Sequence, residues 1–120
     1  MKNFTPTLTP YDIFIGILYN FPGGRNRFNA GCSSIIDFIE EQSEKYSILK
    51  RFTRSEFYSG LDVLLTGRML NCNMCNLNEK EFSPRAVAYS FENFSKAELF
   101  GEDGLKELKD LSRKFVERFG

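Results

Sequence analysis

Hydrophobic and polar residues follow two different spacings along this chain, and the spacing changes just after Gly67. In three segments before that glycine, apolar residues recur every three to four positions, which is the spacing of one buried helix face. These segments are residues 11–20, a stretch that begins near Ser33, and a stretch that begins at Thr53. The sequence therefore predicts three helices in its first half.

Residues with strong start and stop preferences mark the ends of the first and third helices. Thr9-Pro10 suits a helix start, and the Pro-Gly-Gly run at 22–24 ends the helix because proline cannot continue the helical ladder. Thr53 and Glu56 match a capping box, in which each side chain satisfies the other residue's backbone N–H. Gly67 is expected to close the third helix as a left-handed cap.

The second helix is predicted to be amphipathic with an acidic face. One face of this helix is apolar, with Ile35, Ile36, Ile39 and Tyr46, and the opposite face carries Asp37, Glu40, Glu41 and Glu44. A carboxylate needs burial or a like-charged neighbour in a cleft before its pKa suits acid–base catalysis. We therefore expect these carboxylates to be solvated.

After Gly67 the apolar residues alternate with polar or small ones, which is the spacing of a strand. Two strands are predicted, at residues 70–74 and 87–91, with a loop from Asn76 to Arg85 between them. The first strand should direct Cys72 toward the core and Cys75 away from it. Ser95 begins another capping box, and a helical stripe follows it with Leu105, Leu108, Leu111, Phe115 and Phe119.

These elements define an α+β fold that is mostly helical, with a three-helix core, a β-hairpin and a C-terminal helix. At 120 residues the chain fits one domain, residues 1–120. About residues 9–94 would form the core and hairpin, and about residues 95–120 the terminal helix.

Composition restricts the functional classes. Sixteen basic residues balance sixteen acidic ones, so nucleic-acid binding would depend on a local patch rather than on net charge. The chain has no histidine, which is the most frequent general acid or base near neutral pH and the commonest metal ligand. We therefore predict a protein that is not an enzyme, needs no cofactor or metal, and does not enter a membrane.

The three cysteines, Cys32, Cys72 and Cys75, are too few for a disulfide framework, which favours the cytoplasm. Residues 30–32 resemble the end of a lipoprotein export signal, but Arg25 and Arg27 interrupt the segment before them. The spacing of Cys72 and Cys75 suits half a zinc site or a redox dithiol. Ordinary packing of one buried and one loop thiol explains it more simply.

The order of three helices, a hairpin and a last helix resembles the winged helix-turn-helix family. Three segments carry the resemblance: Thr53 to Gly67, Met69 to Cys75, and Ala86 to Glu92. It implies that the third helix enters the major groove of DNA and that the hairpin forms the wing. It also implies that the terminal helix forms a homodimer.

The resemblance assigns double-stranded DNA as the partner and a set of contacts to it. Phosphate contacts are expected from cations in two loops, and base edges are within reach of the third helix; the predicted residues are Arg25, Arg27, Lys50, Arg51, Arg54, Ser55, Ser59 and Arg85. Asp62 on the same helix face and Glu79 and Glu81 on the wing oppose this function. The alternative is a protein–protein interaction module on the same scaffold.

Overall fold

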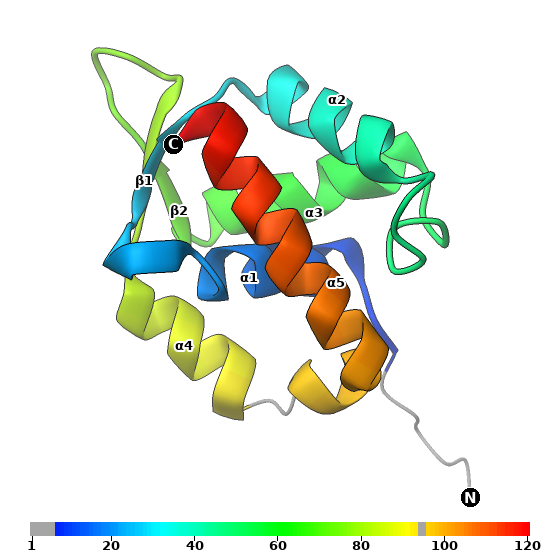
Figure 1. The fold of residues 1–120 in the computed structure, drawn as a ribbon. Coiled ribbons are helices and arrows are strands. Elements are labelled where there is room, and N and C mark those ends of the chain that lie inside the picture. The colour runs from blue at the N-terminus through cyan, green and yellow to red at the C-terminus, as the bar shows by residue number, and fades with distance from the viewer. Residues whose placement is uncertain (1–6, 94–95) are drawn as a thin grey trace, which may run out of the picture.

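The computed structural model describes residues 7–93 and 96–120 and confirms the mostly helical α+β class. Figure 1 shows its elements, which are α1 (Pro10–Tyr19), the short 3-10 helix η1 (Pro22–Gly24), β1 (Arg27–Asn29), α2 (Cys32–Gln42), α3 (Arg54–Thr66), β2 (Leu70–Cys72), β3 (Glu79–Phe82), α4 (Pro84–Asn93) and α5 (Lys96–Phe119). The helices predicted before Gly67 are α1, α2 and α3, and the predicted terminal helix is α5.

Helix α1 lies at the centre of the core because it is apolar around most of its circumference. Ile13, Ile15 and Ile17 are fully buried although they point in different directions from the helix axis. Helices α3, α4 and α5 pack against it, and α5 crosses it on the near side in Figure 1. The buried apolar side chains form one continuous cluster.

A small antiparallel sheet lies at one end of the helices. Its strand order is β1-β3-β2, so β3 is central and pairs with both neighbours. Phe28, Leu70 and Phe82 lie on the buried face of this sheet. The connection between β2 and β3 extends away from the helices in Figure 1, so a hairpin does follow Gly67.

The predicted cap of α1 is present as part of a capping box. Thr9 Oγ1 accepts the Asp12 N–H at 3.3 Å, and the Asp12 carboxylate accepts the Thr9 N–H at 2.9 Å. Asp12 is buried, and its other oxygen lies 2.7 Å from Lys96 Nζ, which joins the start of α1 to the start of α5. The predicted capping box at Thr53 is also present.

The prediction of a strand at residues 87–91 is wrong, because these residues lie in α4. Ser83 precedes this helix, and its carbonyl oxygen accepts the Val87 N–H at 3.1 Å. Val87 and Phe91, four positions apart, are buried, whereas Tyr89 is exposed. Val87 and Phe91 therefore share one helix face. Together with Tyr89 they also fit a two-residue alternation.

The strand that completes the hairpin is β3, inside the segment predicted as a loop. Lys80 and Phe82 are buried and Glu81 is exposed, so β3 does alternate. A lysine at a buried position concealed this pattern. The prediction also missed β1, because residues 27–29 contain only one apolar side chain, Phe28, within a Gly- and Asn-rich connection.

The turn predictions have mixed outcomes. Gly23-Gly24 adopts φ angles of 66° and 70°, and glycine is favoured in this left-handed region. The prediction of a left-handed Gly67 is wrong, since its φ is −80° and Arg68 takes φ 59° instead. Helix α2 ends at Gln42, so the buried Tyr46 belongs to the loop that follows and not to the helix.

The apolar residues in the middle of α5 are buried in the core of the same chain. Leu108, Leu111 and Phe115 are buried in the core, and Gly101, with φ 73°, interrupts the helix near its start. A homodimer through α5 stays a prediction and would have to use another face of the helix. The capping box predicted at Ser95 lies outside the described residues.

Candidate nucleic-acid interface

The loop between α2 and α3, residues 43–53, carries two of the predicted phosphate contacts. Within this loop Ile48 and Leu49 are buried, whereas Lys50 and Arg51 are exposed. Among the described residues, neither cation has an ion-pair partner. Both are therefore available to a negatively charged molecule.

Carboxylates of α5 hold this loop in place. Glu107 accepts hydrogen bonds from the Ser47 N–H and hydroxyl, each at 2.8 Å, and from the Ile48 N–H at 3.3 Å. The Tyr46 hydroxyl donates to Asp110 on the same helix. Residues 46–48 of the loop are thus bonded to α5 just before Lys50 and Arg51. The sequence pattern does not reveal this arrangement.

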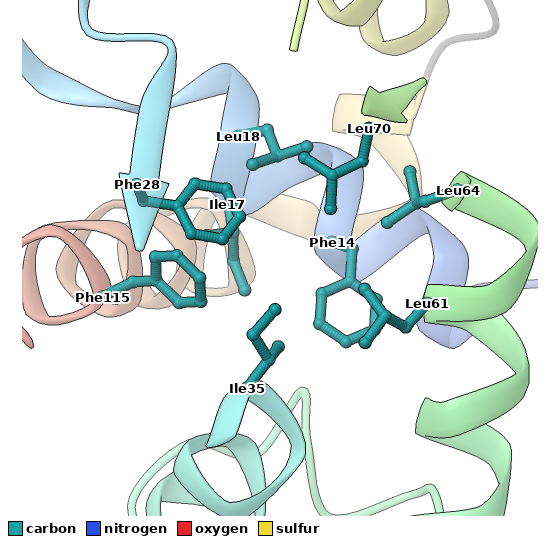
Figure 2. Close-up of a pocket in the computed structure, with 9 residues that line it drawn as sticks. All are labelled: Phe14, Ile17, Leu18, Phe28, Ile35, Leu61, Leu64, Leu70 and Phe115. Atoms are coloured by element: carbon teal, nitrogen blue, oxygen red, sulfur yellow. The ribbon is translucent and has the colours of Figure 1, made fainter. Parts of the chain in front are cut away.

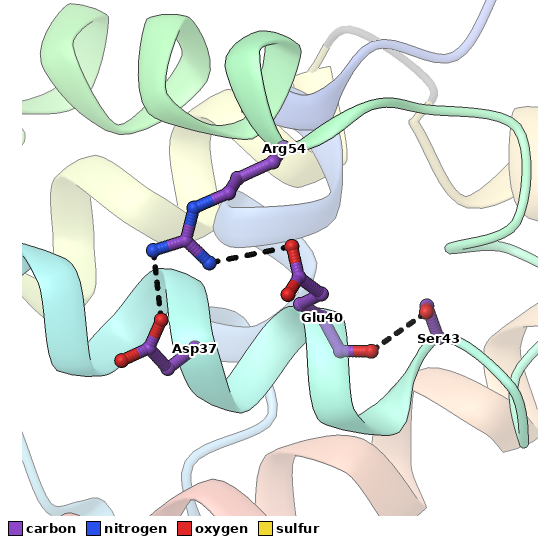
Figure 3. A network of polar contacts seen from close by, with 4 residues as sticks. All are labelled: Asp37, Glu40, Ser43 and Arg54. Carbon is purple, nitrogen blue, oxygen red and sulfur yellow. Dashed lines mark hydrogen bonds and ion pairs between the residues drawn. The ribbon is translucent and has the colours of Figure 1, made fainter.

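Arg54 is engaged within the chain. Its guanidinium lies 2.7 Å from Asp37 and 3.3 Å from Glu40 on α2 (Figure 3), and 5.5 Å from the centre of the Tyr58 ring. At the end of α2 the Ser43 hydroxyl donates to the Glu40 carbonyl oxygen at 2.7 Å. Arg54 couples α2 to α3, and a phosphate would compete with two carboxylates for it.

The exposed side of α3 carries small polar side chains together with Tyr58 and Val63. Ser55 and Ser59 are exposed one turn apart, as expected for residues that reach base edges. Asp62 is exposed on the same face and would repel a phosphate. The face therefore offers hydroxyl groups, while the attraction to a polyanion has to come from the preceding loop.

The other predicted cations form a separate group. Arg27 lies on β1 with its Nε 2.8 Å from Glu81 Oε2 on β3, so its charge is already paired. Arg25 follows η1 and Arg85 lies in the first turn of α4, and both are exposed. Figure 1 places β1 and the start of α4 on the opposite side of the molecule from the loop at 43–53. The predicted residues are not brought together into one positive surface.

The hairpin tip, residues 73–78, exposes apolar side chains. Met74 is 93% exposed and Leu77 is 66% exposed. The prediction that Cys72 faces the core is wrong, because Cys72 is exposed, as is Cys75. The tip has no basic side chain and adds no phosphate contact of its own.

Lys80 fixes the hairpin tip, and the sequence pattern does not identify it. The residue is 1% exposed, and its Nζ donates to the carbonyl oxygens of Ala30 at 2.6 Å and Leu77 at 2.7 Å. The Ala30 N–H in turn donates to the Asn78 carbonyl oxygen at 2.8 Å. The only sequence signal is its two-residue spacing from Phe82.

A cavity of about 10 Å³ lies inside the core (Figure 2). It is lined by Phe14, Ile17, Leu18, Phe28, Ile35, Leu61, Leu64, Leu70 and Phe115. The space is close to that of one water molecule and has no polar partner for one, so it is a packing gap rather than a ligand site. Within residues 7–93 and 96–120, no three Cys, Asp or Glu side chains group to hold a metal ion.

Comparisons of the chain with protein families, with curated proteins and with solved structures find no match. Among the described residues, no helix is both long and apolar enough to cross a bilayer. Function therefore has to be argued from the surfaces of the fold.

The contact between Tyr46 and Asp110 predicts how the loop at 43–53 responds to acid. The hydrogen bond from Tyr46, with the charges of Arg113 and Lys114, lowers the pKa of Asp110. A carboxyl group with a lowered folded pKa stabilises the fold above about pH 4, near the unfolded pKa, and this stabilisation is lost as the pH falls through the folded pKa. We expect Tyr46→Phe to raise the pKa of Asp110 and to flatten the acid-induced loss of stability.

Carbon NMR titration of the Asp110 carboxyl group measures the pKa, and urea unfolding between about pH 2 and pH 6 measures the stability. Tyr58→Phe is the matched control, because Tyr58 is exposed and its ring is kept. An Asp110 titration that is the same in Tyr46→Phe and the wild type would contradict the prediction.

Proposed function

We propose that the chain is a cytoplasmic, non-catalytic regulatory protein that resembles a winged helix and binds duplex DNA through phosphate contacts. The observation that carries this proposal is the pair Lys50 and Arg51, exposed and without an ion pair among the described residues, in the loop that leads into α3 with its exposed Ser55 and Ser59. Lysine and arginine suit phosphates, and serine hydroxyls can reach base edges. The free cysteines favour a reducing compartment.

The arrangement of the elements supports the same function. Helix α3 follows two helices and precedes a hairpin, which is the order of elements in a winged helix. Glu107 holds the loop before α3, and Lys80 holds the hairpin after it. A surface that is ordered before binding loses less conformational entropy when it binds.

Fluorescence anisotropy with a labelled duplex tests the proposal. Binding should be strongest at low salt and weaken as salt rises, because phosphate contacts release counterions. The double variant Lys50→Gln/Arg51→Gln should reduce the slope of log affinity against log salt by about 1.8, or about 0.9 for each lost contact.

The matched control is Lys106→Gln/Lys109→Gln, which removes two exposed cations of α5 that are not among the proposed phosphate contacts. It should leave most of the salt slope intact. Failure of the wild type to bind duplex even at low salt would end the DNA proposal.

A protein-binding module is the second candidate. It is favoured by the exposed Met74 and Leu77 and by the internal pairing of Arg27 and Arg54. A protein retained by the wild type and lost with Leu77→Asp, in a chain that does not bind duplex, would support this function over the first.

A further inference from the structure

Three sulfur-containing side chains lie close together in sequence at the hairpin tip and take no part in the surface around α3. Cys72 ends β2, and Met74 and Cys75 lie in the turn that follows. Both cysteines are free and exposed, and Met74 is almost fully exposed. We propose that this tip binds a soft monovalent cation, Cu(I), through the thiolates of Cys72 and Cys75 and the thioether of Met74.

The backbone of the tip is folded by its own hydrogen bonds. The Cys75 N–H donates to the Asn73 side-chain oxygen at 2.8 Å, and the Asn73 N–H donates to the Glu79 carbonyl oxygen at 3.0 Å. The Asn78 N–H donates to the Asn76 side-chain oxygen at 3.1 Å. The three sulfur ligands therefore lie on one short segment that is already folded before a metal binds.

The types of ligand select the metal. Thiolate and thioether sulfur atoms are soft ligands that suit Cu(I). A structural zinc site needs four ligands, and within the described ranges no further Cys, Asp or Glu joins Cys72 and Cys75 in a metal-binding group. Cu(I) accepts as few as two or three sulfur ligands, so Cys72, Met74 and Cys75 form a sufficient set.

The buried ammonium of Lys80 favours negative charge at the tip. Lys80 pairs with Cys72 across the hairpin, and its Nζ donates to the Leu77 carbonyl oxygen of the tip. No carboxylate among the described residues forms an ion pair with it. A buried charge without a counter-charge is unfavourable. Two thiolates with one Cu(I) carry one net negative charge, which the loaded site would add to the hairpin at Cys72, the residue opposite Lys80 in the strand register.

Binding is a ligand exchange in which no atom is oxidised or reduced. Two Cu–S bonds form with the cysteines while their two thiol protons pass to solvent, and Met74 donates a lone pair without losing a proton. The metal enters and remains as Cu(I). The site is independent of the DNA proposal, because Lys50 and Arg51 take no part in it.

Competition with the Cu(I)–bicinchoninate complex, in anaerobic buffer with reduced thiols, tests this site. We expect the wild type to withdraw one Cu(I) per chain, with amide NMR shifts confined to residues 71–80. Cys72→Ser and Cys75→Ser each remove a ligand and should weaken binding by more than roughly 100-fold, the upper effect of changes in the surrounding shell. Met74→Leu should weaken binding by about tenfold, since it removes the third soft ligand.

Cys32→Ser is the matched control, because Cys32 starts α2 outside the tip, and it should bind Cu(I) like the wild type. The proposal is overturned if the wild type leaves the Cu(I) of the probe in place, or if either serine variant binds as tightly as the wild type. It is also overturned if Met74→Leu has no effect. Far-UV circular dichroism of each variant shows that a loss of binding is not a loss of fold.

Discussion

Replacement of Phe115 by alanine is expected to lower the free energy of unfolding by about 3–5 kcal/mol. Phe115 is 2% exposed, and its ring centre lies 4.9 Å from that of Phe28, 5.5 Å from that of Phe38 and 5.8 Å from that of Phe21. One side chain of α5 therefore contacts β1, α2 and the segment after α1. It also lines the cavity in Figure 2, which the substitution would enlarge.

Urea unfolding followed by circular dichroism measures this loss. A domain of this size has a total stability of about 5–15 kcal/mol, so the variant would retain little of it. Phe119→Ala is the matched control, because Phe119 lies one turn later on α5, is only half-buried and contacts fewer rings. We expect a loss of about 1–2 kcal/mol there. Equal losses in the two variants would contradict the central place of Phe115.

The helix starts are the part of the fold that the sequence predicts best, because they depend on local chemistry. Thr9 and Thr53 each accept a hydrogen bond from the N–H three residues later, and the helices begin directly after them. The relevant partners are adjacent in sequence. A short motif therefore contains all the information that the cap requires.

The strands could not be predicted in the same way, because they depend on partners far apart in sequence. Val87 and Phe91 fit both a helical and a two-residue spacing, and in the fold they lie on the buried face of α4, which packs against α1 and α5. Lys80 is buried because its ammonium donates to the carbonyl oxygens of Ala30 and Leu77. The Ala30 oxygen reaches it only after β1 has paired with β3.

The candidate site shows the same division between local and long-range information. Each exposed cation could be found from the sequence, but its neighbours could not. Arg54 meets Asp37, and Arg27 meets Glu81, only through the packing of α2 on α3 and the pairing of β1 with β3. The chain neutralises the cations that lie at these contacts. In the loop held by Glu107, Lys50 and Arg51 have no ion-pair partner among the described residues.

A β-carbon at Gly60 is expected to destabilise the fold, although alanine is the better helix former. Gly60 lies where α3 crosses the start of α1, and the added atom would lie 2.9 Å from Pro10 Cβ and 2.9 Å from the Tyr11 backbone nitrogen. Helix propensity favours alanine by about 1 kcal/mol, whereas overpacking costs about 1–3 kcal/mol. The obstructing atoms belong to the backbone and to a proline ring and cannot rotate away. We therefore expect an overpacking cost in the upper part of its range, about 2–3 kcal/mol, and a net loss of about 1–2 kcal/mol.

Two other positions separate the steric effect of Gly60→Ala from helix propensity, with urea unfolding as the measurement. Ser59→Ala changes the neighbouring exposed position and should alter stability by no more than about 0.5 kcal/mol. Gly16→Ala places a β-carbon 2.6 Å from Leu108 Cδ1, the end of a side chain that can change its rotamer, so the loss should be smaller than at Gly60. A Gly60→Ala variant as stable as the wild type would contradict the close approach of α3 to the start of α1.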